Sequence, residues 1–175
     1  MAHNRSPERN GAAAATDNCF FAPHRNVFAQ AAVYAADTTL ELPAGGLLAR
    51  VIGFAYAKIG TPYQWGGDGS NGYYDCSGFT MRAYQQAGVQ LPRTSRQQYL
   101  ASPHVAQDGM QPGDLLFWAY NTSDPGSIHH VAIYLGRDPS GTEWMIDAPH
   151  TGATIQVRRV YWTGYIGATR PLGGG

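Results

Sequence analysis

The stretch Asp75-Cys76-Ser77-Gly78-Phe79-Thr80-Met81-Arg82-Ala83-Tyr84 places a cysteine at the start of a segment whose apolar residues recur at helical spacing. Gly88 suits the end of this predicted helix, since glycine commonly follows the last helical turn. Unpaired backbone N–H groups and the helix dipole favour negative charge at a helix N-terminus, which suits a cysteine to react as a thiolate. The stretch predicts a cysteine nucleophile; the alternative is a buried structural thiol.

A histidine stands at the head of an apolar run that is typical of a β-strand, His130-Val131-Ala132-Ile133-Tyr134-Leu135. By strand alternation, His130, Ala132 and Tyr134 share one face of this strand. A histidine at a strand start can present its ring to a cleft. There it would act as general base toward the Cys76 thiol and then as acid toward a leaving amine. Its neighbour His129 is the rival for this role.

Six blocks of the chain, in one order, resemble the NlpC family of bacterial cell-wall peptidases, which are papain-like cysteine endopeptidases that cut the stem peptides of peptidoglycan. The resemblance covers about Leu47 to Arg170. The blocks are Gly60-Thr61-Pro62-Tyr63-Gln64-Trp65-Gly66-Gly67, Asp75-Cys76-Ser77-Gly78, Leu91-Pro92-Arg93-Thr94-Ser95, Gln111-Pro112-Gly113-Asp114-Leu115-Leu116-Phe117, the His130 strand, and Ile146-Asp147-Ala148-Pro149.

This resemblance implies a catalytic triad of Cys76, His130 and Asp147, in which Asp147 orients the imidazole. The family usually has His, Glu or Gln at the third position, so an aspartate there has a shorter reach. His150 is the alternative orienting residue. The Tyr63 hydroxyl and the Cys76 N–H are the implied donors to the oxyanion, although Tyr63 could be only a half-buried aromatic.

The resemblance also implies substrate contacts around the cysteine. Asp75 and Ser77 would contact the free amine or the stem of the peptide, although Asp75 could serve only as a charge that complements the helix dipole. Arg93 and Ser95 are candidates to hold the carboxylate of the γ-linked glutamate, since a planar guanidinium suits carboxylates. Arg93 could equally be a surface residue.

The order of elements along the chain predicts an α+β fold, with N-terminal helices packed on a central antiparallel sheet of five to six strands; the resemblance implies that it is papain-like. An apolar face formed by Leu47, Leu48, Val51, Ile52, Ala55 and Ile59 predicts a core helix between residues 45 and 60. Thr94 with Gln97 predicts the start of a short helix. The predicted strands are 115–120, 131–135, 143–147, 154–160 and 165–169, with a turn at Asp138-Pro139-Ser140-Gly141.

We expect one catalytic domain, residues 45–172, because 175 residues suffice for one ordinary core. Residues 1–44 are expected to form an extension with a possible short helix at 26–36, or an arm that covers the cleft and inhibits the enzyme. Residues 173–175 form a glycine tail. Cys19 is expected to be a free thiol, since a disulfide would consume Cys76.

Composition narrows the classes of partner. Lys and Arg together number 12 and so do Asp and Glu, so the formal net charge is zero. The sequence has no basic stripe of the kind that would predict binding to nucleic acid or to an anionic membrane. No apolar run approaches the length of a membrane span, and no secretory signal peptide is visible. Neither a metal nor another cofactor is expected, because the histidines lack ligand spacing; His104 is expected in a polar loop. The expected state is a monomer.

The expected function is therefore hydrolysis of peptidoglycan stem peptides between γ-D-glutamate and the diamino acid, which is meso-diaminopimelate or lysine, through a thioester. The expected place of action is the bacterial cell wall, by an unknown export route, in a bacterial or phage-encoded enzyme. The alternatives are an amidase or acyltransferase that uses the same residues, and a catalytically silent domain that binds peptidoglycan.

Overall fold

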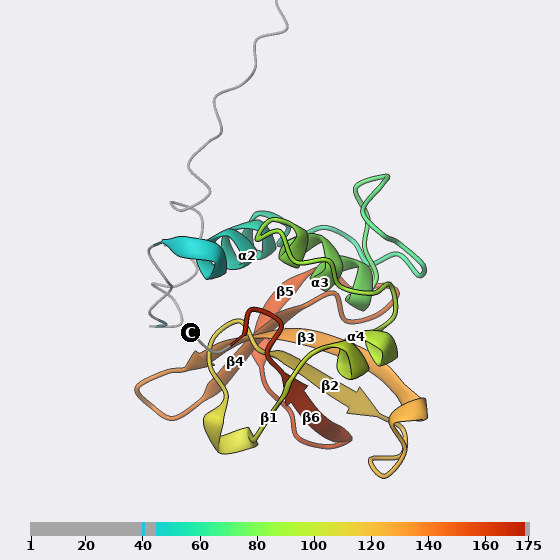
Figure 1. Cartoon of the computed structure of the whole chain (residues 1–175). Coiled ribbons are helices and arrows are strands. Elements are labelled where there is room, and N and C mark those ends of the chain that lie inside the picture. Colours follow the sequence, from blue (N-terminus) through green and yellow to red (C-terminus); the bar gives the residue numbers. More distant parts are fainter. Residues whose placement is uncertain (1–39, 41–44, 174–175) are drawn as a thin grey trace, which may run out of the picture.

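The structure is a computed structural model that describes Leu40 and residues 45–173 (Figure 1). The predicted helix at 26–36, Cys19 and the proposed covering arm lie outside the described residues. In the described part, helices precede strands, as the sequence predicts for an α+β fold. The elements are α2 (Gly46–Ala57), α3 (Cys76–Gln85), α4 (Ser95–Ala101), β1 (His104–Val105), η1 (Gln107–Gly109), β2 (Leu115–Ala119), η2 (Pro125–Ser127), β3 (Ile128–Arg137), β4 (Glu143–Asp147), β5 (Gln156–Arg159) and β6 (Tyr165–Thr169).

The strands form one six-stranded sheet in the order β1-β6-β2-β3-β4-β5, and every neighbouring pair is antiparallel. The prediction of an antiparallel sheet of five to six strands is confirmed. The edge strand β1 was not predicted, because two residues are too short to show an alternating pattern. The expectation that His104 lies in a polar loop is therefore wrong. Its ring packs edge-to-face on Tyr99 with 4.4 Å between the ring centroids.

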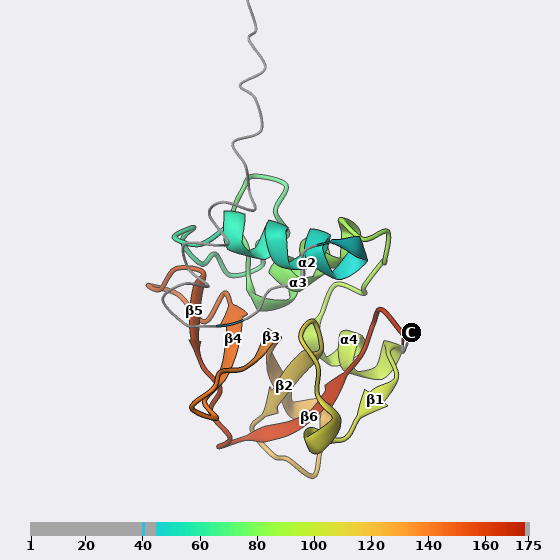
Figure 2. The same ribbon diagram turned by 90° about the vertical axis from the view of Figure 1, so that its left-hand side faces the viewer.

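Both faces of the sheet are buried, as β2 shows most clearly. Its alternate residues Leu115 and Phe117 belong to the main core, while Leu116 and Trp118 belong to a second, smaller cluster. Val105 from β1 and Val160, just beyond β5, both pack on this second cluster although they lie near opposite edges of the sheet. The sheet therefore curls around the second cluster, a shape visible in Figure 2.

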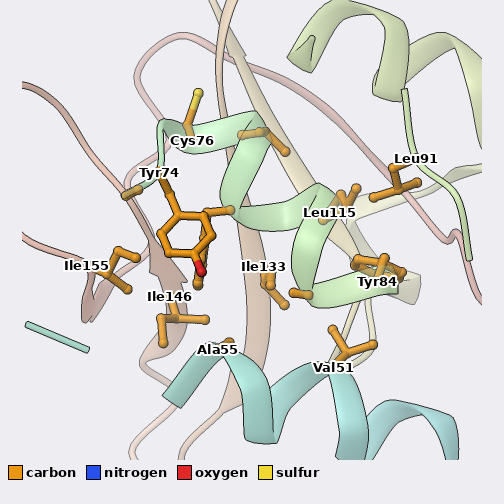
Figure 3. Close-up of a cluster of buried hydrophobic side chains, with 14 of the residues drawn as sticks. Val51, Ala55, Tyr74, Cys76, Tyr84, Leu91, Leu115, Ile133, Ile146 and Ile155 are labelled. Atoms are coloured by element: carbon orange, nitrogen blue, oxygen red, sulfur yellow. The ribbon is translucent and has the colours of Figure 1, made fainter. Parts of the chain in front are cut away.

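The main core lies between the sheet and the helices α2 and α3 (Figures 1 and 3). Helix α3 packs against both α2 and β3, and its predicted apolar residues Phe79, Ala83 and Tyr84 are fully buried. Most of the predicted face of α2 is also confirmed. Leu47 is the exception, since it is 51 % exposed in the first turn of α2.

Two local sequence signals take the predicted form. Thr94 caps α4 and forms a reciprocal capping box with Gln97. Asp138 closes the hairpin between β3 and β4 by accepting hydrogen bonds from the backbone N–H groups of Ser140 (2.9 Å) and Thr142 (3.0 Å). Among the described residues, no helix has both the length and the apolar character needed to cross a membrane.

Candidate active site

The loop that leads to Cys76 is tied to a second loop more distant in the chain. Gly60 N–H donates to the Ile155 carbonyl, Ile155 N–H donates to the Thr61 carbonyl, and Tyr63 N–H donates to the Ala153 carbonyl, each at 2.9 Å. These backbone bonds fix the position of Tyr63 relative to the segment that connects β4 and β5. Two loops that are far apart in the sequence, at residues 60–63 and 153–155, therefore lie side by side at the site.

The first turn of α3 is held tightly against this loop. The Asp75 carboxylate caps the helix by accepting from the Gly78 N–H at 2.7 Å, and the Asp75 N–H donates to the Gly67 carbonyl at 2.9 Å. A Cβ atom at position 78 would lie only 2.1 Å from the Gly67 carbonyl oxygen. Only glycine can therefore occupy the last position of the Asp-Cys-Ser-Gly motif in this arrangement.

Cys76 is the first residue of α3, and its sulfur points away from the labelled hydrophobic side chains of the core (Figure 3). The residue is 8 % exposed and carries a free thiol. The Cys76 sulfur lies 4.0 Å from the His129 carbonyl oxygen, so the thiol is adjacent to the start of β3. Cys76 is thus buried, as in the alternative interpretation of the sequence, but it faces the site.

His130 lies on β3 at a bulge, where the register between β2 and β3 shifts between Trp118 and Ala119. A bulge adds a residue to one strand and re-aims the neighbouring side chains. The His130 Nε2 atom lies 2.6 Å from Asp147 Oδ2, and the His130 side chain is 6 % exposed. Burial lowers the pKa of His130, but hydrogen bonds with Asp147 and Cys76 outweigh burial and raise it to about 9.

Asp147 is fully buried at the end of β4 and bonds to two cationic groups. Besides His130, it accepts a hydrogen bond from Arg158 Nε at 3.0 Å on Oδ1 and a second one from Arg158 Nη2 on Oδ2. Burial alone would raise the pKa of Asp147, but its bonds with His130 and Arg158 lower it below its ordinary value. Asp147 therefore remains a carboxylate.

Arg158 is the residue of the site that the sequence did not reveal. It lies on β5 opposite Met145 of β4, which places it on the same face of the sheet as Asp147. Its guanidinium also stands over the Tyr161 ring, at 5.1 Å from the ring centroid. The only signal in the sequence was an arginine in a predicted strand adjacent to that of Asp147, and the pairing register needed to use it was unknown.

The rival residues His129 and His150 lie elsewhere in the same cleft. The His129 ring stacks on Tyr120, with 4.0 Å between centroids and an interplanar angle of 16°. His150 is exposed, and its Nδ1 atom lies 2.9 Å from the Thr151 carbonyl oxygen. Asp147, and not His150, contacts His130.

A second polar cluster lies on the other side of Cys76. Arg93 grips Asp75 with both ends of its guanidinium, at 3.0 Å from Nη1 to Oδ1 and 2.6 Å from Nη2 to Oδ2. Its Nη1 also donates to Ser77 Oγ at 3.1 Å. Ser95 begins α4 and is buried nearby. Asp75, Ser77 and Arg93 thus form one hydrogen-bonded cluster. Within it, Asp75 also caps the N-terminus of α3.

Tyr63 lies beside both polar clusters. Burial, Cys76 and Asp75 together raise the pKa of Tyr63 to about 12, although Arg93 opposes this effect. Tyr63 is therefore a neutral phenol over the whole physiological pH range, and its hydroxyl can donate a hydrogen bond. This property fits the role of oxyanion donor that the family resemblance implies.

The cleft has two cavities that meet at Cys76. The first, here called the His130 side, has a volume of about 460 Å³, and the second, the Asp75 side, about 530 Å³. Both are lined by Tyr63, Trp65, Cys76, Tyr120 and His129. A larger cavity of about 740 Å³ beside the β3–β4 hairpin contains none of the predicted site residues.

Each side of the cleft has its own charged lining. His130, Pro149, His150, Thr151, Arg158 and Tyr161 line only the His130 side, whereas Gly66, Asp75, Ser77, Arg93, Thr94, Ser95 and Ile128 line only the Asp75 side. Within the described residues, no three His, Cys, Asp or Glu side chains gather as a metal site. The chemistry available here is that of a thiol with a buried imidazole and carboxylate.

Residues 60–170 match the NlpC/P60 family. A probable endopeptidase p60 of Listeria seeligeri is 43 % identical over 87 residues, which is 50 % of this chain and 16 % of that protein. A gamma-D-glutamyl-L-lysine dipeptidyl-peptidase of Bacillus subtilis is 39 % identical over 99 residues, which is 57 % of this chain and 31 % of that protein. This chain therefore spans less than a third of the length of either relative.

Solved structures give the same result. An NlpC/P60 family protein from Bacillus cereus superposes with a TM-score of 0.65 and 31 % identity, covering 76 % of this chain and 42 % of that one. RipD from Mycobacterium tuberculosis, a non-catalytic NlpC/p60 domain protein adapted to peptidoglycan binding, superposes with a TM-score of 0.61 and 29 % identity, covering 73 % of this chain and 99 % of that one. By the match over residues 60–170 and the shared fold, the chain belongs to the NlpC/P60 family.

Proposed function

We propose that this protein is a peptidoglycan endopeptidase that cleaves stem peptides between γ-D-glutamate and the following diamino acid, with Cys76 as the nucleophile. The observation that carries the proposal is the chain of contacts from the Cys76 thiol to the His130 ring and on to the Asp147 carboxylate, which lies 2.6 Å from the His130 Nε2 atom. A cysteine, a base and a group that orients the base are the parts that nucleophilic acyl transfer requires.

In the first half of the reaction, the Cys76 thiolate attacks the γ-carbonyl carbon of D-glutamate. The carbon–nitrogen bond then breaks, and the His130 imidazolium gives its proton to the leaving amine of the diamino acid. A pKa of about 9 for His130 keeps the imidazolium protonated near neutral pH, so that it can act as the acid. The acyl group remains on Cys76 as a thioester.

In the second half, a water molecule attacks the thioester carbonyl. Neutral His130 takes the proton of this water, the carbon–sulfur bond breaks, and the products are a glutamate carboxyl group and the Cys76 thiolate. The Tyr63 hydroxyl and the Cys76 backbone N–H are proposed to donate to the oxyanion in both tetrahedral intermediates. Asp147 holds the imidazole at the angle that both proton transfers need.

The Asp75 side is proposed to receive the part of the peptide that ends in γ-D-glutamate. Asp75 supplies a carboxylate for the free amine of the stem peptide, and Arg93 keeps that carboxylate in place through two hydrogen bonds. Because Arg93 is already engaged with Asp75, its role toward the glutamate carboxylate is secondary. Ser77 and Ser95 would complete the polar lining.

The substrate places the action of the enzyme at the bacterial cell wall. A single domain over residues 45–172 and inhibition by residues 1–44 are also proposed. Because Leu40 is 6 % exposed and belongs to the main core, a truncation that tests inhibition should begin at Leu40 and not at residue 45. Faster cleavage by the truncated protein would support inhibition, and equal rates would contradict it.

The function is tested by incubating the protein and its Cys76→Ala variant with peptidoglycan fragments and identifying the products by mass spectrometry. We expect cleavage between D-glutamate and the diamino acid by the parent protein alone. Release of a sugar-linked lactyl group would indicate an amidase, and a new acyl bond would indicate an acyltransferase. Tight binding without any cleavage would indicate a silent binding domain, as in RipD.

A further inference from the structure

We propose that the His130 side of the cleft selects meso-diaminopimelate over lysine, and that Arg158 is the group that recognises the additional carboxylate. This inference rests on the proposed function and deepens it. The position of His130 determines the direction of the substrate along the cleft. The leaving amine takes its proton from His130, and His130 lines only one of the two cavities that meet at Cys76. The diamino acid must therefore occupy the His130 side.

The permanent charge that lines that cavity is positive. No aspartate or glutamate is among the residues that line the His130 side, and Arg158 is the one permanently charged side chain among them. A lysine side chain would bring an ammonium group into a cavity that offers it no carboxylate. The side chain of meso-diaminopimelate ends in an ammonium group and a carboxylate. Its carboxylate can pair with the Arg158 guanidinium.

The Asp147–Arg158 ion pair is oriented so that its positive end faces the cleft. The Asp147 side chain is 0 % exposed, whereas the Arg158 side chain is 32 % exposed and lines the cavity. The Asp147 carboxylate is also shared with His130, so it neutralises Arg158 only in part. A ligand on the His130 side therefore meets the cation and not the anion.

The guanidinium of Arg158 has donors to spare. An arginine carries five N–H donors; the bonds to Asp147 use one from Nε and one from Nη2, and a bond with Tyr161 uses a third. The Tyr161 ring, 5.1 Å from its guanidinium carbon, supports one face of the group. A planar guanidinium held in this way suits the in-plane binding of a second carboxylate. His150, exposed on the same side, adds no negative charge.

The experiment compares three tetrapeptides that differ only in the diamino acid: meso-diaminopimelate, the same residue with its side-chain carboxyl group converted to a carboxamide, and L-lysine. The carboxamide has the shape of the acid without its charge. We expect the parent enzyme to cleave the diaminopimelate peptide with a kcat/KM about tenfold above that of the other two, since one partly exposed charged hydrogen bond is lost in each.

Variants on β5 separate recognition from positioning. Arg158→Gln should lower kcat/KM for all three peptides, because Asp147 loses a partner, and should also bring the ratio between the peptides close to one. A role in positioning alone would lower all three rates and leave the ratio intact. Arg159→Gln is the matched control, since Arg159 is the next residue of the strand, stands by the Trp144 ring and does not line the cleft. It should keep the parental ratio.

Equal rates of the parent enzyme on all three peptides would overturn the selectivity while leaving the proposed function intact. A ratio that persists in Arg158→Gln would overturn the assignment to Arg158. If none of the peptides is cleaved at this bond, the proposed function fails and the inference fails with it. The measurement on the parent enzyme requires no variant, so it stands even if Arg158→Gln does not fold.

Discussion

Asp147 is bonded by both His130 and Arg158, so a single carboxylate links the proposed base to the strand beyond it. The contact with Arg158 compensates for the short aspartate side chain, because it fixes the carboxylate where the imidazole can reach it. The position of the Asp147 carboxylate and its ionised state thus have the same cause. The two cationic partners hold the carboxylate in place and lower its pKa.

Asp147→Asn should therefore change the pH dependence of activity as well as its size. We expect kcat/KM to fall by about 10²-fold or more, since an oriented general acid–base contributes that much. Hydrogen bonding and charge from Asp147 help to raise the pKa of His130 to about 9. The alkaline limb of the parent's pH–rate profile should therefore lie near pH 9 and move to lower pH in the variant.

The measurement is kcat/KM between pH 5 and pH 10 for both proteins. Asp108→Asn removes an exposed carboxylate that does not line the cleft, and it should leave the profile unchanged. An unshifted alkaline limb in Asp147→Asn would show that the carboxylate does not control the imidazolium.

A second prediction at the scale of one residue concerns Gly78. Gly78→Ala should destabilise the protein by about 2 to 3 kcal/mol, because the new Cβ would meet a backbone oxygen that the Asp75 N–H also holds. The displaced turn carries Cys76, so activity should fall as well. Thermal unfolding and peptide cleavage measure the two effects.

Gly109→Ala is the control for that substitution, since its Cβ would make only an ordinary contact at 3.8 Å with Val105. Its melting temperature should stay within about 2 °C of the parent, as expected for a surface change below about 0.5 kcal/mol. Equal stability of Gly78→Ala and the parent would mean that the loop at Gly67 yields easily.

One difference separates the residues that the sequence revealed from the residues that it did not reveal. Cys76 begins a helix with a readable pattern, His130 heads a readable apolar run, and Asp147 ends a predicted strand. Arg158 acquires its contacts only through the register of β4 against β5, and Gln98 only through the packing of α4 on α3. Register and packing are non-local, so these two residues could not be predicted from neighbouring sequence.

Among the elements, α4 is attached to the first turn of α3 by one buried side chain. Gln98 is 0 % exposed, and its Nε2 donates at 2.9 Å both to the Ser77 carbonyl and to the Pro92 carbonyl. Its Oε1 accepts from Thr80 Oγ1 at 2.7 Å. Every polar atom of this amide is therefore bonded, and the helix that bears Cys76 is braced from the side.

Gln98→Leu should remove this brace. We expect a loss of about 2 kcal/mol in the free energy of unfolding, because the Pro92 carbonyl loses its bond from Gln98. The Ser77 carbonyl and the Thr80 hydroxyl each lose one of two bonds, since they also bond to each other at 3.0 Å. Chemical denaturation measures the loss. On the same helix, Leu100→Ala removes a side chain that is 65 % exposed and should cost less than about 0.5 kcal/mol. Similar midpoints for the two variants would contradict the bracing role.

The sequence predicts elements well where a pattern is long enough to be read. The bounds of β4 and β6 match the predictions at both ends, and the helix of Cys76 begins at the predicted residue. The strand predicted at 154–160 is shorter, Gln156–Arg159, because the residues before it bond to the loop at 60–63 instead. Tertiary hydrogen bonds, which no local pattern encodes, set that boundary.

Across the whole molecule, the buried His130–Asp147 pair couples folding to pH. The pKa of His130 is raised above its ordinary value of 6.5, so its contribution to stability is complete below pH 6.5 and is lost as pH rises through about 9. The pKa of Asp147 is lowered, so its contribution is present above the ordinary value of 3.8 and is lost as pH falls below that value. Both contributions are complete between about pH 4 and pH 6.5.

The melting temperature of the parent protein should therefore decline as the pH rises from 6.5 to above 9. His130→Gln removes this titrating group and should flatten the decline, whatever its stability at pH 6. Scanning fluorimetry across pH 5 to 10 on both proteins makes the comparison. Parallel curves would mean that another group controls alkaline stability.

The order of the site residues along the chain has a consequence for biosynthesis. A ribosome delivers Cys76 first, then the proposed base His130, then Asp147. Only afterwards come the Ala153 and Ile155 backbone groups that anchor the loop of Tyr63, and the Arg158 that fixes Asp147. Because domains fold as units during synthesis, the thiol emerges well before the groups that would activate it. If Cys76 is the nucleophile proposed above, a nascent chain cannot cleave amide bonds around it until the last strands have been translated and paired.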